Sequence, residues 1–242
     1  MNLAIVITAS QYNPPRIPLP ACDCDADLIE ALVGSSSDFD DKLFLRNLPD
    51  SAVIKKKLTE FIAQYKGSDI DQVFFYFSGH GDFSGDELFY LLPDYDEKQK
   101  RQTSLENSEL DSLLRGLQPN TAVKVIDACH SGVPYIKDTD AFQNYIKGTK
   151  DEFKKCYFMF SSHLDQASYQ NAEFSFFTKS FVQAIAQHKA DSVRLKDIID
   201  YVADAFSGNS QQTPFFVVQA DFTESFCRVT ESLRKRLHGR MA

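Results

Sequence analysis

The chain has 242 residues, of which 43% are hydrophobic and 25% are charged, a composition typical of a soluble globular protein. Its 34 acidic residues outnumber its 26 lysines and arginines, and this balance argues against nucleic acid as a partner, because phosphate binding requires clustered cations. No apolar run approaches the ~20 residues that a membrane-spanning helix needs, so we expect no membrane partner. Five cysteines, an odd number in a chain without a recognisable export signal, indicate free thiols and a cytoplasmic location.

The hydrophobic pattern predicts strands and helices that alternate along the chain. In chain order we expect a strand at 3–8, a helix at 26–33, a strand at 43–45, a helix at 50–65, a strand at 73–77, a hairpin at 83–92, a helix at 108–117, strands at 122–126 and 156–160, helices at 176–188 and 195–206, a strand at 215–218 and an amphipathic helix at 224–238. The proline-rich segment 11–20 and the irregular segment 132–155 are expected to be loops. Repeated strand–helix units imply a mostly parallel sheet with helices on both faces.

Two motifs with reactive side chains directly follow two of these strands. Residues 78–81 (SGHG) follow the strand at 73–77, and residues 127–132 (DACHSG) follow the strand at 122–126. Open α/β sheets place their ligand sites just past the carboxyl ends of parallel strands, so we expect the two motifs to meet there. An imidazole in such a site can take the proton of a thiol and produce the nucleophilic thiolate. The sequence therefore predicts a site that contains His80 and Cys129.

The segments FYFSGHG and DACHSG resemble the His and Cys motifs of the caspase-like cysteine peptidases, and are most similar to those of the metacaspases and bacterial caspase-like proteins. Cys129 lies 49 residues after His80, in agreement with the spacing of about 50 residues in caspases. The segments LPACDCDADLIEALV, LLPDYD and SFFTKSFVQAI are also similar to this family. The resemblance implies a three-layer α/β/α caspase-like fold with a mostly parallel central sheet of about six strands over residues 1–222. Residues 223–242 would then be a C-terminal helix that could link to a further module.

The resemblance also implies a role for each residue of the two motifs. Cys129 would be the nucleophile, and His80 would be the general base and acid of a cysteine endopeptidase. The backbone N–H groups of Gly81 and Cys129 would form the oxyanion hole. His130 is a competing candidate base, although its side chain directly follows the nucleophile and would project elsewhere. The sequence does not reveal what orients the ring of His80, for which a backbone carbonyl would suffice.

Two acidic residues predict a preference for basic side chains. Asp127 occupies the position at which caspases carry glutamine and metacaspases carry aspartate, and Asp25 falls where metacaspases keep a second pocket acid. Two carboxylates in one cleft would pair with a guanidinium or ammonium group, so we expect cleavage after Arg or Lys. Alternatives stay open: Asp127 could cap a turn, Asp25 could be a helix N-cap, and Arg16 resembles an arginine of the aspartate-binding pocket of caspases.

The segment after the nucleophile lies where the family keeps its intersubunit linker. If the enzyme cuts after basic residues, this exposed segment could be its own substrate, and the alternative is an ordinary surface loop. The candidate cleavage sites are Lys137, Lys147, Lys150, Lys154 and Lys155.

Many metacaspases need calcium, but this sequence gives little support for a calcium site. The position at which they often carry paired aspartates reads Asn107-Ser108 here. The remaining candidate ligands, Asp94, Asp96, Asp138 and Asp140, lack a recognisable spacing. We therefore expect that no metal or other cofactor is required.

The bacterial members of the family that the chain resembles often act as effectors in signalling or defence, where a sensor releases the protease on a partner protein. The basic C-terminal tail could lead to such a sensor. The alternative function, from a different class, is a non-catalytic interaction module that uses the same fold. The presence of both His80 and Cys129 argues against it, because a degenerate module has no chemical need for the pair.

Overall fold

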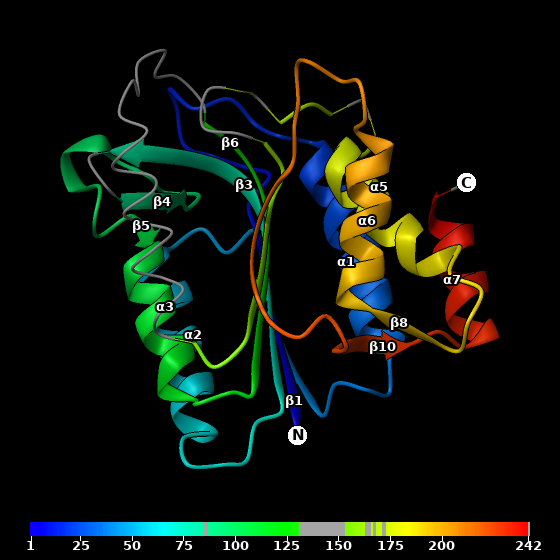
Figure 1. Ribbon diagram of the computed structural model, residues 1–242. Coiled ribbons are helices and arrows are strands. Elements are labelled where there is room, and N and C mark those ends of the chain that lie inside the picture. The colour runs from blue at the N-terminus through cyan, green and yellow to red at the C-terminus, as the bar shows by residue number, and fades with distance from the viewer. Residues whose placement is uncertain (85–86, 131–152, 163–165, 167, 171–172, 242) are drawn as a thin grey trace.

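A computed structural model of the chain describes residues 1–84, 87–130, 153–162, 166, 168–170 and 173–241, and for Cys129 and His130 it describes the backbone. These residues form three layers, a central β-sheet with helices packed on both faces (Figure 1). The arrangement confirms the expected α/β/α fold with a mostly parallel sheet. Within these ranges, the helices are all too short or too polar to span a bilayer.

Six strands make up the continuous part of the sheet. Their order across the sheet is β2 (Asp41–Arg46), β1 (Asn2–Thr8), β3 (Gln72–Ser84), β6 (Thr121–His130), β7 (Cys156–Phe160) and β9 (Phe215–Gln219). The first five strands are parallel, and β9 is antiparallel to β7. At the C-terminal end of β3, the short strands β4 (Glu87–Leu91) and β5 (Ser104–Glu106) add antiparallel pairs, and β3 with β4 forms the expected hairpin.

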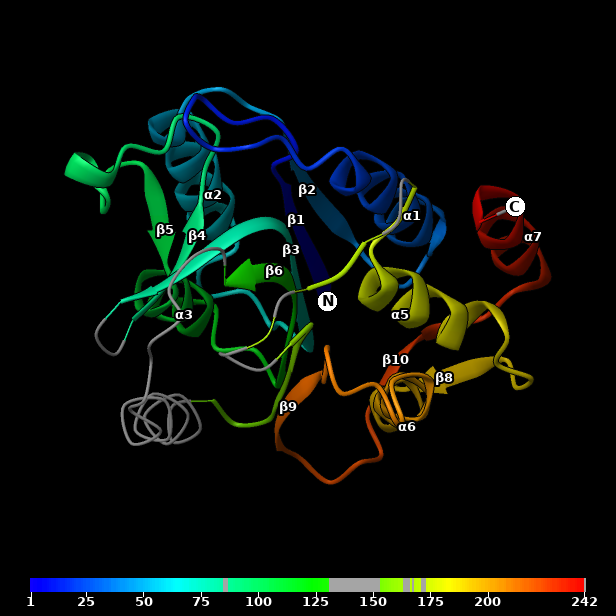
Figure 2. The ribbon, with the colours of Figure 1, turned by 90° about the horizontal axis from the view of Figure 1, so that it is seen from above.

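The helices divide between the two faces of the sheet (Figures 1 and 2). One face is covered by α1 (Ala21–Ser35), α5 (Phe176–Ala186), α6 (Leu195–Ala205) and α7 (Glu231–Met241), and the other by α2 (Ser51–Gln64) and α3 (Asn107–Gly116). The described elements also include the 3-10 turn η1 (Glu97–Gln99) and the antiparallel pair β8 (Ser192–Arg194) and β10 (Ser225–Arg228).

Each face of the sheet has its own hydrophobic core, and β3 contributes to both. Phe74 and Tyr76 lie in the core beneath α1 and α5, whereas Phe75 and Phe77 lie in the core beneath α2 and α3. All four side chains are fully buried. This alternation is the reason that an uninterrupted apolar run forms a central strand, because successive side chains of a strand point to opposite faces.

The C-terminal segment differs from the single helix expected at 224–238. Residues Ser225–Arg228 form β10, which pairs with β8, and α7 begins only at Glu231. The cause is the burial of Phe226, whose ring packs against Phe74 and Phe181. An extended backbone brings this ring into the core while β8 provides hydrogen-bond partners for its peptide groups.

Helix α7 packs against the same core as α1 and α5. It buries Leu233 and Leu237. Arg234 donates hydrogen bonds to the carbonyl oxygens of His188 and Ala190, and thereby joins α7 to the segment that follows α5. The domain boundary at residue 222 stays a prediction.

Candidate active site

The two sequence motifs lie side by side on neighbouring strands. In the parallel pairing of β3 with β6, Ser78 lies opposite Asp127 and His80 lies opposite Cys129. The flanking strands stop earlier, since β1 ends opposite Ser78 and β7 ends before Asp127. The SGHG motif and residues 127–130 (DACH) are therefore parts of the strands and not loops after them, because β3 and β6 keep pairing with each other beyond the ends of β1 and β7. At a strand separation of ~4.8 Å, the backbones of His80 and Cys129 are direct neighbours.

The side chain of His80 is held by a backbone carbonyl. Its Nε2 atom lies 2.9 Å from the carbonyl oxygen of Ile17, in the loop between β1 and α1. A carbonyl oxygen can only accept a hydrogen bond, so Nε2 carries the proton and Nδ1 presents its lone pair. Nδ1 is buried and has no hydrogen-bond partner among the described residues. The carbonyl of Ile17 is thus the group that orients the ring, which the sequence does not reveal.

The surroundings of His80 favour its neutral form. Burial lowers the pKa of His80 below its ordinary value of 6.5, the hydrogen bond to Ile17 opposes this change, and the positive charge of Arg16 lowers the pKa further. The neutral imidazole is the form that can accept a proton, so the ring is prepared to act as a base at neutral pH.

Tyr12 fixes the backbone beside His80. Its hydroxyl accepts a hydrogen bond from the N–H of His80 at 2.8 Å and donates one to the carbonyl oxygen of Leu91 at 3.2 Å. The centroids of the Tyr12 and His80 rings lie 4.7 Å apart. This approach requires glycine at position 79, because a Cβ atom there would lie 2.5 Å from Tyr12 Oη.

Asp127 lies at the N-terminus of α5, where its carboxylate is surrounded by donors. It accepts hydrogen bonds from the hydroxyl of Ser168 at 2.8 Å, from the N–H and hydroxyl of Thr178 at 3.2 and 2.7 Å, and from the hydroxyl of Ser175. Ser175 is the N-cap residue of α5, so the positive end of the helix dipole faces the carboxylate. Asp127 therefore both binds a helix end and lines the cavity described below.

Asp25 approaches the same helix end from α1. Its Oδ1 atom accepts a hydrogen bond from the N–H of Ser175 at 3.0 Å, and its Oδ2 atom is buried without a hydrogen-bond partner in the described part of the chain. Burial raises the pKa of Asp25 well above its ordinary value, the negative charge of Asp127 raises it further, and hydrogen bonds from Ser175 and Ser78 oppose this change. Because α1 begins at Ala21, Asp25 lies inside the helix and is not its N-cap.

A narrow cavity opens between the two acids. Its volume is about 10 Å³, room for about one water molecule. No lysine or arginine is among its described lining residues, so the two carboxyl groups dominate its electrostatics and favour a cation. The lining residues are Leu19, Cys22, Asp25, Ser78, Gly79, Asp127, Ser168, Gln170 and Ser175.

Arg16 lies outside this cavity. Its guanidinium carbon lies 5.1 Å from the centroid of the Tyr95 ring. Both residues line a second, larger cavity of about 780 Å³, whose wall includes Asp94 and Asp96. The placement of Arg16 does not match that of an arginine binding an aspartate side chain beside Asp127.

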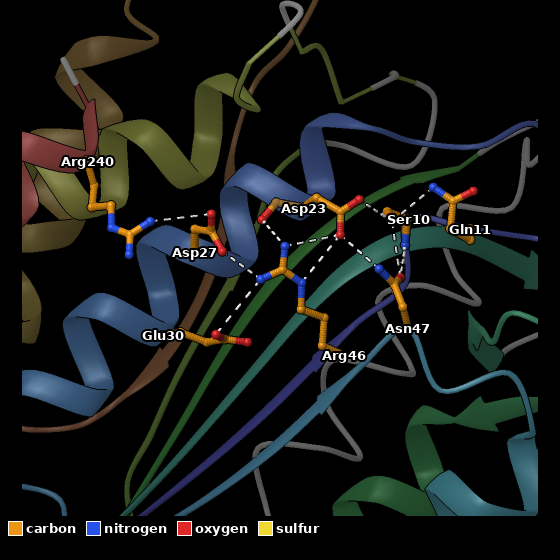
Figure 3. A network of polar contacts seen from close by, with 8 residues as sticks. All are labelled: Ser10, Gln11, Asp23, Asp27, Glu30, Arg46, Asn47 and Arg240. Carbon is orange, nitrogen blue, oxygen red and sulfur yellow. Dashed lines mark hydrogen bonds and ion pairs between the residues drawn. The ribbon is translucent and has the colours of Figure 1, made fainter.

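A charged network fixes α1, which carries Asp25, to the edge of the sheet (Figure 3). Arg46 of β2 forms ion pairs with Asp27 at 2.6 Å and with Asp23 at 3.2 Å. Asp23 also accepts a hydrogen bond from Asn47 at 2.8 Å, and Arg240 of α7 reaches Asp27 at 3.5 Å. These contacts restrain the first turns of α1 relative to the strands that carry the two motifs.

The remaining expected catalytic groups are defined by their backbone positions. Gly81 lies opposite His130 in β6 and opposite Tyr90 in β4. Cys129 lies opposite His80, the residue directly before Gly81. The two residues whose N–H groups are the expected oxyanion donors are therefore close neighbours on paired strands. Their role stays a prediction.

Two of the five linker lysines fall on described residues. Lys154 donates to Oδ1 of Asn120 at 2.7 Å, and Lys155 forms ion pairs with Asp221 and Glu224 directly before β7. The other three, Lys137, Lys147 and Lys150, lie outside the described residues.

Asp94 and Asp96 act as hydrogen-bond acceptors for helix starts. Asp94 accepts from the N–H and the hydroxyl of Ser51, and Asp96 accepts from the N–H of Lys98 in η1. Asp138 and Asp140 lie outside the described residues, among which no group of three metal-ligating side chains occurs. That no metal is required stays a prediction.

Several residues of the site are not indicated by the sequence motifs. Ile17 and Tyr12 lie in the proline-rich loop, which has no periodic pattern that could reveal them. Ser175 and Thr178 could have been found, since a serine before a predicted helix start is an N-cap signal. Ser78 belongs to the SGHG motif, but only the strand register shows that it faces Asp127.

The fold and the paired motifs define a caspase-like α/β protein. The sequence matches the family model Peptidase_C14, caspase domain, over residues 1–236, so the chain belongs to the caspase domain family of cysteine peptidases, whose substrates are proteins or peptides. Among solved structures, protein GSU0716 from Geobacter sulfurreducens has a TM-score of 0.62 and 15% sequence identity, covering 92% of this chain and 98% of that one. At this identity the likeness shows the fold alone. No sequence among the curated proteins matches the chain.

Proposed function

We propose that the protein is a cysteine endopeptidase that cleaves protein chains after Arg or Lys, with Cys129 as nucleophile and His80 as base. The observation that carries this proposal is the pairing of His80 with Cys129 on adjacent strands, with the imidazole proton engaged by Ile17. Residues opposite each other in parallel strands lie on the same face of the sheet. The free lone pair of Nδ1 is therefore the group best suited to take the thiol proton.

The chemistry follows from these assignments. Nδ1 of His80 takes the proton of the Cys129 thiol, and the thiolate attacks the carbonyl carbon of the scissile bond. The N–H groups of Gly81 and Cys129 stabilise the oxyanion, and Nδ1 returns its proton to the leaving amine. Nδ1 then takes a proton from the water that attacks the thioester, and the thiol is regenerated as the acid departs.

The preference for a basic side chain rests on the cavity between Asp25 and Asp127. Two carboxyl groups converge there on the N-terminus of α5, without an opposing lysine or arginine among the described residues. An ammonium or guanidinium group entering this cavity would form charge-assisted hydrogen bonds with them. The empty cavity is smaller than such a side chain, so the walls must open when substrate binds.

The same preference makes self-processing part of the proposal. Lys137, Lys147 and Lys150 follow the nucleophile in the chain, where the family keeps its intersubunit linker. Lys155 is a poorer candidate, because its side chain is held by two carboxylates at the start of β7. We further propose that the enzyme acts in the cytoplasm as an effector of a bacterial signalling or defence system. We also propose that its activity does not require calcium.

Hydrolysis of fluorogenic tetrapeptides with Arg, Lys, Gln or Asp at the cleavage position tests the proposal. The wild type should cleave the Arg and Lys peptides alone, equally with calcium and with a chelator. Cys129→Ala and His80→Ala should each lose at least about 1,000-fold in rate. Cleavage after Asp but not after Arg or Lys would overturn the specificity. An unreactive Cys129 thiol and no turnover of any peptide would favour the non-catalytic interaction module.

A further inference from the structure

The two acids of the cavity have very different hydrogen-bond environments. The carboxylate of Asp127 accepts four hydrogen bonds, from Ser168, Ser175 and Thr178. Asp25 accepts one, from the N–H of Ser175, although its side chain is equally inaccessible to solvent. Its second oxygen, Oδ2, has no partner among the described residues. The donors that could stabilise a buried negative charge are therefore concentrated on Asp127.

The direction of the hydrogen bonds makes this division firm. Thr178 has one hydroxyl proton, which it donates to Asp127 at 2.7 Å, so Tyr76 donates its own proton to Thr178. The hydroxyl of Ser175 likewise donates to Asp127, and accepts from the N–H of Thr178 at 3.1 Å. None of these hydroxyl protons remains for Asp25.

We propose that Asp25 holds a proton while the cavity is empty and releases it when the basic side chain of a substrate enters. This inference rests on the proposed cleavage after Arg or Lys. The exchange is balanced: the neutral carboxyl group and the substrate cation become an ion pair, and one proton passes to solvent. Asp25 then acts as the residue that recognises the positive charge, and Asp127 as the acid held in place by the donors at the start of α5.

Several observations support a proton on Asp25. Two ionised carboxylates that share one buried site repel each other, so one of them is neutral unless enough donors surround both. Burial and the nearby charge of Asp127 both raise the pKa of Asp25. Hydrogen bonds from Ser175 and from the hydroxyl of Ser78, another wall residue, oppose this rise, but burial and the charge of Asp127 outweigh them.

Among the described residues, the groups around Asp25 supply no cation that would oppose this state. From β6 it faces Asp127, and from β3 it faces Tyr76, whose pKa is itself raised by burial and by the two acids. On its own helix, Cys24 has a pKa raised by burial and by acidic neighbours, which include Glu173 from the segment before α5. Two basic residues that contact α1, Arg46 and Arg240, pair with other acids of that helix (Figure 3).

The proposal has consequences for selectivity. A neutral substrate side chain such as that of Gln carries no positive charge that could displace the proton of Asp25. An acidic substrate side chain is repelled by Asp127. While Asp25 is protonated in the free enzyme, affinity for a basic peptide should rise about tenfold per pH unit, because one proton leaves for each peptide bound. Once the pH exceeds the pKa of Asp25 in the empty cavity, the affinity should become constant.

Calorimetric titration of the inactive Cys129→Ala protein tests this prediction. The probe is an acetylated tetrapeptide amide with one Arg, titrated from about pH 5 to about pH 9 in buffers of different ionisation enthalpy. We expect release of close to one proton per peptide at the acid end, falling toward zero as the pH rises. Asp25→Asn should abolish this release and flatten the pH profile. The control Asp204→Asn, which changes an exposed acid of α6, should leave both unchanged.

An infrared measurement tests the same claim without a substrate. The empty Cys129→Ala protein should show the C=O stretch of a protonated carboxyl group that is missing when Asp25→Asn is added, and the peptide should remove it. If Asp25→Asn does not fold, the loss of the carboxyl C=O stretch on addition of the peptide still decides the matter, because it needs no change at Asp25 and cannot come from a proton that leaves His80. Peptide binding without proton release at any pH would overturn this inference and leave the proposed function intact. Failure of Arg and Lys peptides to bind or be cleaved would overturn both.

Discussion

The carbonyl oxygen of Ile17 and Nε2 of His80, 63 residues apart in the chain, lie 2.9 Å from each other. This single contact fixes which ring nitrogen carries the proton, and it leaves Nδ1 as the base. It also joins the proline-rich loop after β1 to the extension of β3 that carries the SGHG motif. The tautomer that the proposed chemistry requires is thus set by backbone geometry and not by a third charged side chain.

The pH dependence of kcat should reflect the buried position of His80. Burial lowers the pKa of His80, and the active form is the deprotonated one, so the acid limb of the kcat profile should fall below pH 6.5. Arg16→Gln removes a positive charge that lowers this pKa, so the limb should move to higher pH. Lys98→Gln, in the wall of the same large cavity as Arg16, is the matched control and should leave the limb in place. An acid limb above 6.5 in the wild type would contradict the assignment.

Gly79→Ala should damage the site through a steric conflict with Tyr12. The new Cβ would lie 2.5 Å from Tyr12 Oη and 3.0 Å from a ring carbon of Phe77, so we expect a loss of about 1–3 kcal/mol in the free energy of unfolding. Tyr12→Phe removes the hydroxyl that serves two buried backbone groups, at a cost of about 1–3 kcal/mol each. Urea unfolding measures both effects.

The two changes should combine less than additively. The double variant lacks the hydroxyl that the new Cβ would meet first, so its loss of stability should be smaller than the sum of the single losses. Gly116→Ala is the control, because a Cβ there has no atom within 4 Å, and its stability should be unchanged or slightly higher. Strict additivity would show that Tyr12 and Gly79 do not depend on each other.

A buried ion pair beneath the motif-bearing strand should be important for stability. Nζ of Lys124, in β6, lies 2.6 Å from Oδ1 of Asp111 and 2.9 Å from Oδ1 of Asn107, and Lys124 is completely buried. Lys124→Met removes the cation and leaves Asp111 buried without its partner, so we expect a loss of about 3–5 kcal/mol. Urea unfolding should show most of this loss recovered in Lys124→Met with Asp111→Leu.

The exposed pair of Lys56 with Glu60 provides the comparison for this prediction. Lys56→Ala should change the free energy of unfolding by no more than about 0.5 kcal/mol, because water screens the pair. Equal effects of Lys56→Ala and Lys124→Met would contradict the account of the buried pair.

Self-processing should produce fragments that depend on the active thiol. Wild-type protein incubated alone should be cut within the segment that contains Lys137, Lys147 and Lys150, and Cys129→Ala should stay intact. Intact-mass spectrometry identifies the bond. Replacing these three lysines by Gln should prevent the cut, whereas Lys155→Gln should not. A wild-type chain that stays whole after prolonged incubation, while it cleaves Arg peptides, would remove self-processing from the account.

The central features of the fold could be predicted because they are local in the sequence. Each buried strand is a short apolar run, and the two motifs directly follow two such runs, so their meeting on adjacent strands was predictable from the order of elements. The helix expected at 26–33 begins earlier, at Ala21. The sequence does not indicate this start, because residues 21–25 (ACDCD) carry no strong apolar period. The strand β10 was missed because Phe226 is buried by partners from distant parts of the chain.

The contacts that define the site are long-range, and for this reason the sequence could not reveal them. Asp25 and Ser175 are 150 residues apart, and only the packing of α1 beside α5 brings them together. Similarly, the hydroxyl of Tyr12 meets the backbone of His80 because a loop without a periodic pattern folds back over the sheet edge. Residue types and motifs indicated which chemistry to expect, but not which donor serves which acid.

The most direct test of the central claim is labelling of the protein with an arginine chloromethyl ketone, followed by peptide mass spectrometry. If Cys129 and His80 form a reactive pair beside an acidic pocket, the label should be found on Cys129 of the wild type. It should form at least about 100-fold more slowly in His80→Ala, and the aspartate analogue should react far more slowly than the arginine one. Labelling of Cys22 or Cys24 instead, or equal reaction of Cys129 with and without His80, would contradict the account.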